Sequence, residues 1–288
     1  MIKCPSCKTE NIDEAIYCYR CGQKLPQIKT CGNPQCGNPL PVGAVFCPEC
    51  GCRVLSLEPK IGDYYYSDGT YSSELINNKE CVGVVFSLNT TEEEKKYGWT
   101  HGHIIALKNA KLDVLRTDLL KRNFTNKDCG FLRWGYNVVH PIEMFGEYEY
   151  KKLRNDREGF SYTMQLFEES GCEAFCAAKS FPVSLPKNKT SRWYLPAIGQ
   201  WLDVVENLAS LKFRLDHKSM STYYEDGCKL KDVYEKTKIF EAPFRTYFSS
   251  TQNKAERCFV FSCKEHSCEV STVSKYSGLS HVRPVAAF

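Results

Sequence analysis

Apolar residues recur at helical spacing in two stretches of the chain. In the clearer stretch, Pro196 suits the first turn of a helix. One apolar face follows it, formed by Ile198, Trp201, Leu202, Val205, Leu208 and Ala209. The opposite face carries Gln200, Asp203, Glu206 and Asn207. We expect a helix that packs against a sheet, with Trp193 and Trp201 in the core rather than serving as a ligand platform.

The second helical stretch starts at Met164 and is interrupted by Gly171, which weakens a helix interior. Its apolar residues recur at steps of three and four, and they are Met164, Phe167, Ala174, Phe175 and Ala178. We predict a second helix here.

Aromatic and β-branched residues predict strands on both sides of these helices. A hairpin is expected within 61–75, turning at Ser67, Asp68 and Gly69. Further strands are expected at 81–88, 103–107, 246–250, 258–262 and 269–273. The charged segment 90–96 fits a solvated loop or a short capped helix, and the apolar tail 282–288 should lie back on the domain. Strands, two helices and more strands indicate an α+β domain.

Cysteines near the N-terminus follow a different pattern, in which the intervals between them indicate metal binding. Eight of them form two groups of four: Cys4, Cys7, Cys18 and Cys21, then Cys31, Cys36, Cys47 and Cys50. Two thiolates on one tight turn and two on a facing turn supply the four sulfurs of a structural zinc site. We therefore predict two closed zinc sites, whose metal binding supplies folding energy.

The second cysteine group repeats the first. A shift of 29 residues carries the last three cysteines of the first group onto those of the second, and only Cys31 breaks register. The same shift superposes Ala15-Ile16-Tyr17 on Ala44-Val45-Phe46, which we expect to shield the metals because each repeat has almost no core. Cys52 falls outside the pattern and is either a spare thiol or a competitor for a site. This region, residues 1–54, resembles the double zinc ribbon.

The same thiols could instead form disulfides, carry an iron-sulfur cluster or remain unpaired. Disulfides need an oxidising compartment, and the opening Met1-Ile2-Lys3-Cys4 leaves no room for an export leader. We therefore favour zinc and expect a cytoplasmic location. No stretch approaches the roughly 20 apolar residues of a membrane span, so we expect a soluble protein.

The formal net charge of +4 favours nucleic acid only until the thiols are counted. A zinc ion with four thiolates carries a net −2, so two filled sites lower the total from +4 to 0. Lysine and arginine in the ribbon region are Lys3, Lys8, Arg20, Lys24, Lys29 and Arg53. Without a charge excess, a solvated surface is the simpler interpretation, and a protein partner is favoured over nucleic acid.

Residues 55–61 have the composition of a linker, with Pro59 inside it and Gly62 after it. The remainder, 62–288, resembles the bacterial major paralogous domain, also called the Lcl C-terminal-like family. The shared phrases are GDYYYSDGTY at 62–71, HGHIIAL at 101–107, WYLPAIGQW at 193–201, YFSS at 247–250 and VRPV at 282–285. The resemblance implies a C-type-lectin-like fold, in which N- and C-terminal strands pair and a loop-rich region carries whatever is bound. Phe248 stands where the family commonly has Trp, and no ligand residue is implied.

Several other residues of the large domain could carry chemistry. His101 and His103 would share one strand face, without an evident third metal ligand. Cys263, His266 and Cys268 fit a hairpin turn better than a closed zinc site.

Two cysteine pairs are also candidates. Cys172 and Cys176 lie one helical turn apart and could react together or simply be buried thiols. The C-type-lectin-like fold includes formylglycine-generating enzymes with a cysteine pair near the C-terminal end, for which Cys258 and Cys263 are the nearest candidates here.

Two hypotheses follow. In the first, the chain is a non-enzymatic interaction protein whose ribbons contact a protein or, less favoured, a nucleic-acid partner, and whose large domain presents loops between Glu235 and His281 to an unknown ligand. In the second, it is a cysteine- or metal-dependent enzyme with its site in the C-terminal domain.

Overall fold

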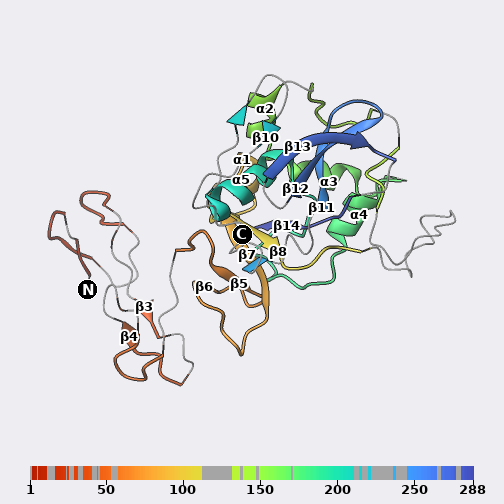
Figure 1. Ribbon diagram of the computed structural model, residues 1–288. Coiled ribbons are helices and arrows are strands. Elements are labelled where there is room, and N and C mark those ends of the chain that lie inside the picture. The colour runs from red at the N-terminus through yellow and green to blue at the C-terminus, as the bar shows by residue number, and fades with distance from the viewer. Residues whose placement is uncertain are drawn as a thin grey trace. The chain divides into compact units, whose positions relative to one another are not determined.

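Short strand pairs make up the N-terminal part of the computed structural model, and longer sheets with helices make up the rest (Figure 1). The chain divides into two compact units, residues 1–57 and 58–288. The structure describes residues 2–4, 6–11, 17–23, 25, 29–31, 35–40, 44, 46–52, 58–111, 132–136, 139–146, 149–169, 171–210, 214–215, 220–221, 236–237, 245–264, 267–276 and 280–288.

The N-terminal unit contains two hairpins. Strand β1 (Ile2–Lys3) pairs with β2 (Glu10–Asn11), and β3 (Lys29–Thr30) pairs with β4 (Pro39–Leu40). Its buried apolar clusters are very small: Cys4, Cys18 and Leu25 in the first ribbon, and Cys31, Leu40 and Cys47 in the second. Cysteines are therefore most of what these cores contain, so the sulfurs must provide most of the cohesion.

One sheet of the C-terminal unit joins its first strands to its last. The order is β14-β8-β7-β5-β6, with every pair antiparallel. The bounds are β5 Tyr64–Tyr66, β6 Tyr71–Ser72, β7 Cys81–Ser87, β8 His103–Ala106 and β14 Val285–Ala287. The predicted hairpin is confirmed as β5 and β6, and the apolar tail lies on the domain by adding a strand beside β8.

The second sheet has the order β11-β12-β13-β10-β9. Its bounds are β9 Arg214–Leu215, β10 Met220–Ser221, β11 Arg245–Gln252, β12 Arg257–Lys264 and β13 Ser267–Ser274. The three predicted C-terminal strands are confirmed, and each is longer than expected. Most of the range expected to present loops is thus strand, while 238–244, 265–266 and 277–279 lie outside the described residues.

Five helices lie among the described residues. They are α1 Glu92–Lys96, α2 Tyr150–Asn155, α3 Gly159–Leu166, α4 Glu173–Lys179 and α5 Ile198–Ala209. Helix α1 settles the choice left open for 90–96, because Thr91 and Glu94 form a capping box at its start. Helices and sheets together agree with the predicted α+β class. No helix in this part of the chain is both long and apolar enough to span a bilayer.

The single helix expected from Met164 onward is in fact two, α3 and α4. The chain turns between them at Gly171, whose φ of +87° suits glycine. A Cβ atom there would lie 2.5 Å from the ring of Tyr136. Gly171, which we expected to weaken the interior of one helix, therefore forms the turn between α3 and α4.

Helix α5 is confirmed, and its apolar face is buried between sheets, since it contacts β7 of one sheet and β11 and β12 of the other. Trp201 is fully buried and donates its indole N–H to the carbonyl of Phe248 at 3.1 Å. Trp193 is likewise buried. Both tryptophans are core residues, as predicted.

Only half of the polar face of α5 reaches the surface, because Asn207 is exposed and Glu206 half-buried, whereas Gln200 and Asp203 are buried. Gln200 is fully buried and bonds the backbone N–H of Ala197 and the hydroxyl of Tyr194. Asp203 is also buried, and both its oxygens accept hydrogen bonds from Arg157. The segment from α2 to α3 covers Gln200 and Asp203, a second contact surface that the apolar stripe did not indicate.

Candidate metal centres

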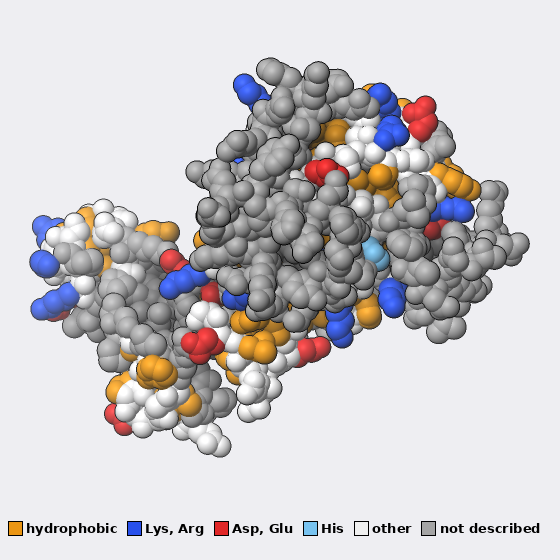
Figure 2. Space-filling view, in the orientation of Figure 1, with side chains coloured by type: hydrophobic (Ala, Val, Ile, Leu, Met, Phe, Trp, Pro, Cys, Tyr) orange, Lys and Arg blue, Asp and Glu red, His pale blue; other side chains and the backbone are white. Residues whose placement is uncertain are grey.

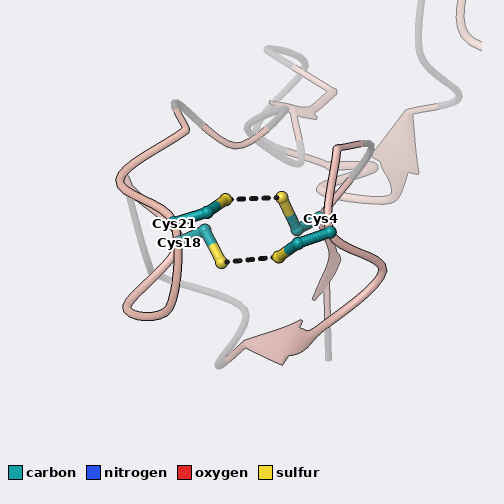
Figure 3. Close-up of side chains that lie close together, drawn as sticks. Cys4, Cys18 and Cys21 are labelled. Atoms are coloured by element: carbon teal, nitrogen blue, oxygen red, sulfur yellow. Dashed lines mark hydrogen bonds between the residues drawn. The ribbon is translucent and has the colours of Figure 1, made fainter.

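The first ribbon brings its four cysteine sulfurs together from two facing turns. Cys4 Sγ lies 3.5 Å from Cys21 Sγ, and Cys7 Sγ lies 3.5 Å from Cys18 Sγ. Figure 3 shows Cys4 directed across the gap toward Cys21, with Cys18 beside Cys21 on the same side. All four ligand atoms lie within 4.8 Å of one another.

The second ribbon repeats this arrangement. Cys31 Sγ lies 3.4 Å from Cys50 Sγ, and Cys36 Sγ lies 3.8 Å from Cys47 Sγ. Residues 32–34, where this turn is longer than that of the first ribbon, lie outside the described residues, and the N–H of Cys31 bonds the carbonyl of Asn38 at 2.8 Å.

These sulfur positions fit zinc. Zinc–sulfur bonds of about 2.3 Å in a tetrahedron place the sulfurs roughly 3.8 Å apart, and the measured pairs span 3.4 to 3.8 Å. The two clusters of four cysteines thus fit two zinc ions. In each cluster four sulfurs fill all four coordination positions of the ion. A structural zinc site has this form, whereas a catalytic site leaves one position open.

The electrostatics of the first cluster also call for a cation. Hydrogen bonds from the hydroxyl and backbone of Thr9 lower the pKa of Cys7 to about 6. The pKa of Cys21 is raised to about 12, because the neighbouring sulfurs and burial outweigh the hydrogen bond from Gln23. Four sulfurs this close repel one another when charged, and a bound divalent ion removes that repulsion.

A backbone feature accompanies every sulfur turn. The residue after the second cysteine of each turn has positive φ: Lys8 (62°), Gly22 (71°), Gly37 (60°) and Gly51 (68°). This left-handed conformation reverses the chain, and glycine adopts it without strain. Three glycines in this position are a signal visible in the sequence.

The aromatic residues expected to shield the metals do not do so. Tyr17 is 60% exposed and Phe46, its equivalent in the repeat, is 59% exposed. Tyr19 is exposed even further, at 80%. Leu25 and Leu40, rather than these aromatics, are the buried apolar residues beside the cysteines. The ninth thiol, Cys52, is exposed, and its carbonyl accepts a hydrogen bond from the N–H of Cys47.

The structure does not bring His101 and His103 together as a site. His103 is buried, and its Nε2 lies 3.0 Å from both oxygens of Glu94. His101 is exposed and stacks on the ring of Phe288. The two histidines thus have separate structural partners.

The Cys263, His266 and Cys268 segment does form a hairpin, because Cys263 in β12 lies opposite Cys268 in β13. Cys268 is fully buried and disulfide-bonded. His266 and the Cys263 side chain lie outside the described residues. Cys258 and Cys263 both lie on the single strand β12, where five residues of extended chain separate their Cα atoms by about 17 Å, too far for the two residues to act as a pair.

A third group of metal-binding side chains lies in the C-terminal unit, where sequence reasoning did not place one. His140 Nδ1 lies 2.8 Å from Glu169 Oε2 and 3.9 Å from Cys172 Sγ. The three ligand atoms fall within 4.8 Å of one another. Cys172 had been noted only with Cys176, whose sulfur instead lies 3.9 Å from the hydroxyl of Ser180. No short motif signals the group, because His140 is far from the others in sequence.

The N-terminal similarity to known proteins is specific. Residues 4–51 match the family described as "Double zinc ribbon". Over 57 residues the chain is 39% identical to Protein FraH of Nostoc sp. (strain PCC 7120), a stretch that covers 20% of this chain and 19% of FraH. The chain thus aligns with about a fifth of the length of that relative.

A structural comparison covers more of the chain at lower similarity. A fimbrial protein from Bacteroides ovatus ATCC 8483 is 16% identical, with 80% of this chain and 49% of that chain covered and a TM-score of 0.38. We draw no functional argument from this structure. The sequence match and the two sulfur clusters together support a double zinc ribbon at the N-terminus of this chain.

Proposed function

We propose that this protein is a zinc-binding, non-enzymatic interaction protein whose double zinc ribbon contacts a protein partner. The observation that carries the proposal is the exposure of Tyr17, Tyr19 and Phe46 on a unit that has very little core of its own. Figure 2 shows apolar side chains at the surface of the N-terminal unit. Solvent-exposed aromatics of this kind are typical of protein interfaces, where they dominate binding energy.

Charge supports a protein partner over nucleic acid. With two zinc ions and eight thiolates, residues 1–55 carry a formal charge of −2, because six basic and four acidic side chains contribute only +2. Lys3, one member of the basic set, lies 3.5 Å from Glu10 in an ion pair. A phosphate-binding surface needs a dense basic patch, which this balance does not supply.

We further propose that the C-terminal unit is a C-type-lectin-like domain of the major paralogous type. In support, β14 joins the sheet that the first strands of the unit form. The shared phrases serve this framework: Gly102 lies so close to β7 that a Cβ would sit 2.0 Å from the carbonyl of Ser87. Arg283 is fully buried and bonds Asn109 and the carbonyl of Ala106. These residues maintain the fold, and its ligand stays unassigned.

The partner contact is tested with the full chain as bait. Replacing both Tyr17 and Phe46 by serine should reduce capture of a protein that binds wild type by at least about tenfold, since losing two interface aromatics removes several kcal/mol. The zinc content of the double variant should equal that of wild type. The matched control is Leu75→Ser, which changes a residue of the C-terminal unit that is 56% exposed. Equal capture by the double variant and wild type would refute the ribbon contact.

A cysteine-dependent enzyme is the alternative, and the His140 group gives it a specific location. The geometry is poor for nucleophilic catalysis, because Glu169 already occupies the Nδ1 atom that would accept the thiol proton. Burial also raises the pKa of Cys172 to about 12, so the thiol stays protonated at neutral pH. These facts favour the interaction protein.

A further inference from the structure

We propose that His140, Glu169 and Cys172 form a third metal site, which takes a zinc-like divalent ion and leaves a fourth coordination position open. The site is separate from the ribbons and goes beyond the interaction role proposed above. Its donors are an imidazole nitrogen, a carboxylate oxygen and a sulfur, a mixture that zinc and cobalt accept.

The donor distances are close to those that an ion would impose. Zinc bonds of about 2.0 to 2.1 Å to nitrogen and oxygen and about 2.3 Å to sulfur put tetrahedral ligands roughly 3.3 to 3.6 Å apart. The His140 nitrogen lies 2.8 Å from the carboxylate oxygen and 3.9 Å from the sulfur. A change of about half an ångström in each His140 distance would match these values, and the Glu169 oxygen and the Cys172 sulfur lie within 4.8 Å of each other.

The site is held on both sides by backbone contacts. The Glu169 carbonyl accepts the N–H of Cys172 at 3.1 Å, so both ligands belong to the turn that joins α3 to α4. Gln252 clamps the backbone of His140, accepting its N–H at 2.9 Å and donating to its carbonyl at 3.2 Å. Two rigid segments therefore present the three donors, which is the preorganisation that a metal site needs.

Hydrogen bonding alone accounts poorly for the buried imidazole. His140 is 3% exposed, and its Nε2 has no hydrogen-bond partner among the described residues. A buried polar atom without a partner costs about 1 to 3 kcal/mol. An ion bound at Nδ1 leaves the ring proton on Nε2, so metal binding at this site must outweigh that cost.

The group formed by His140, Glu169 and Cys172 has room for an ion and a route to solvent. A Cβ on Gly135 would lie 2.8 Å from His140 Nε2 and 3.4 Å from Cys172 Sγ, so glycine at 135 keeps a side chain away from both donors. Cys172 is 1% exposed, while the Glu169 side chain is 37% exposed. The carboxylate thus connects the buried donors with solvent and provides the entry point for the ion. On binding, the Cys172 thiol releases its proton to water and its sulfur bonds the metal.

Cobalt(II) binding to the full chain carrying two zinc ions, one for each ribbon, tests the site, because a cobalt–thiolate bond gives a near-ultraviolet charge-transfer band that zinc lacks. We expect wild type to bind one cobalt with this band and Cys172→Ala to lose it. Glu169→Gln, which changes a partly exposed side chain and should fold normally, is expected to weaken cobalt binding at least about tenfold.

Two cysteine variants serve as controls. Cys176→Ala changes the other thiol of the same helix region, and Cys52→Ala removes the ninth ribbon thiol; both should retain the band. The proposal is overturned if wild type shows no band. It is equally overturned if the band survives in Cys172→Ala or disappears in Cys52→Ala, since the thiolate would then belong elsewhere.

Discussion

Lys8 occupies a position where the other three sulfur turns have glycine. Its φ of 62° places a lysine side chain in the left-handed region, which costs about 1 to 2 kcal/mol for a non-glycine residue. Glycine at position 8 would remove that strain and stabilise the fold. Part of this stabilisation would be offset, because glycine has more conformational freedom in the unfolded chain. Lys8 is therefore a site where the first ribbon is less stable than its repeat geometry permits.

We expect Lys8→Gly to stabilise the first ribbon by about 0.5 to 1 kcal/mol. The measurement is zinc retention by the full chain under competition with a chelator, where the first zinc should be lost several-fold more slowly. Gly22→Ala introduces the strain at the equivalent turn and should act in the opposite direction. Faster zinc loss in Lys8→Gly would mean that the lysine contributes a contact worth more than its strain.

Glu94 illustrates how a residue of the capping box can also organise a core. Its carboxylate accepts hydrogen bonds from the N–H of Thr91 and the hydroxyl of Tyr194, and it lies 3.0 Å from His103. Burial raises its pKa, but the interaction with His103 and the two hydrogen bonds outweigh burial, so the net shift is downward. The native state therefore favours ionised Glu94.

This lowered pKa predicts an acid dependence of stability. The contribution of Glu94 is complete above the pKa of about 4.3 in the unfolded chain, and it is lost as pH falls through the lower native value. Glu94→Gln should reduce stability at neutral pH and flatten the loss of stability toward about pH 3. Urea unfolding across this range is the measurement, with Glu93→Gln on the same helix as control. An unchanged acid slope in Glu94→Gln would contradict the assignment.

At the scale of elements, the start of α5 is fitted against the end of α2. Gly199 lies at this contact, and a Cβ on it would sit 2.3 Å from the carbonyl oxygen of Asp156 and 2.8 Å from that of Arg154. Because both neighbours are backbone atoms, neither can rotate aside. Glycine is thus required by packing at a position where helix propensity favours alanine.

Gly199→Ala should destabilise the C-terminal unit by about 1 to 3 kcal/mol, although alanine in a helix normally gains about 1 kcal/mol over glycine. The shift is measured as the midpoint of chemical unfolding. Gly98→Ala is the control, because that glycine has open space around it and only backbone strain at φ +85°. A stabilised Gly199→Ala chain would show that the two segments can separate at little cost.

The sequence pattern predicted elements that pack against the protein through one face. It did not predict burial of a second face by a segment that is distant in sequence. The apolar stripe of α5 and the aromatic and β-branched residues of β11 to β13 predicted both the type and the position of these elements. The burial of Asp203 depends on Arg157, which lies 46 residues away and comes from a covering segment that no periodicity reveals. The same reason hides the His140 group, whereas the ribbon cysteines are close enough in sequence for spacing alone to indicate zinc.

At the scale of the whole molecule, the two units differ in what stabilises them. Removing zinc with a chelator should unfold residues 1–57, because the sulfurs form most of that core, and leave the main melting transition of 58–288 in place. Thermal scanning of the full chain before and after chelation is the measurement. A small decrease in the C-terminal transition that is absent in Cys172→Ala would be the contribution of the third ion. Complete loss of both transitions together would contradict independent folding.

The position of β14 in its sheet has a consequence for how the protein is made. This strand pairs with β8, about 180 residues earlier in the chain, so the ribosome must complete nearly all of the C-terminal unit before that pair can form. The ribbons, in contrast, can take up zinc while later residues are still being translated. A nascent chain that stops before Val285 would have folded ribbons and a sheet in which β8 lacks its partner strand β14. Chaperones would have to cover this exposed strand to prevent aggregation.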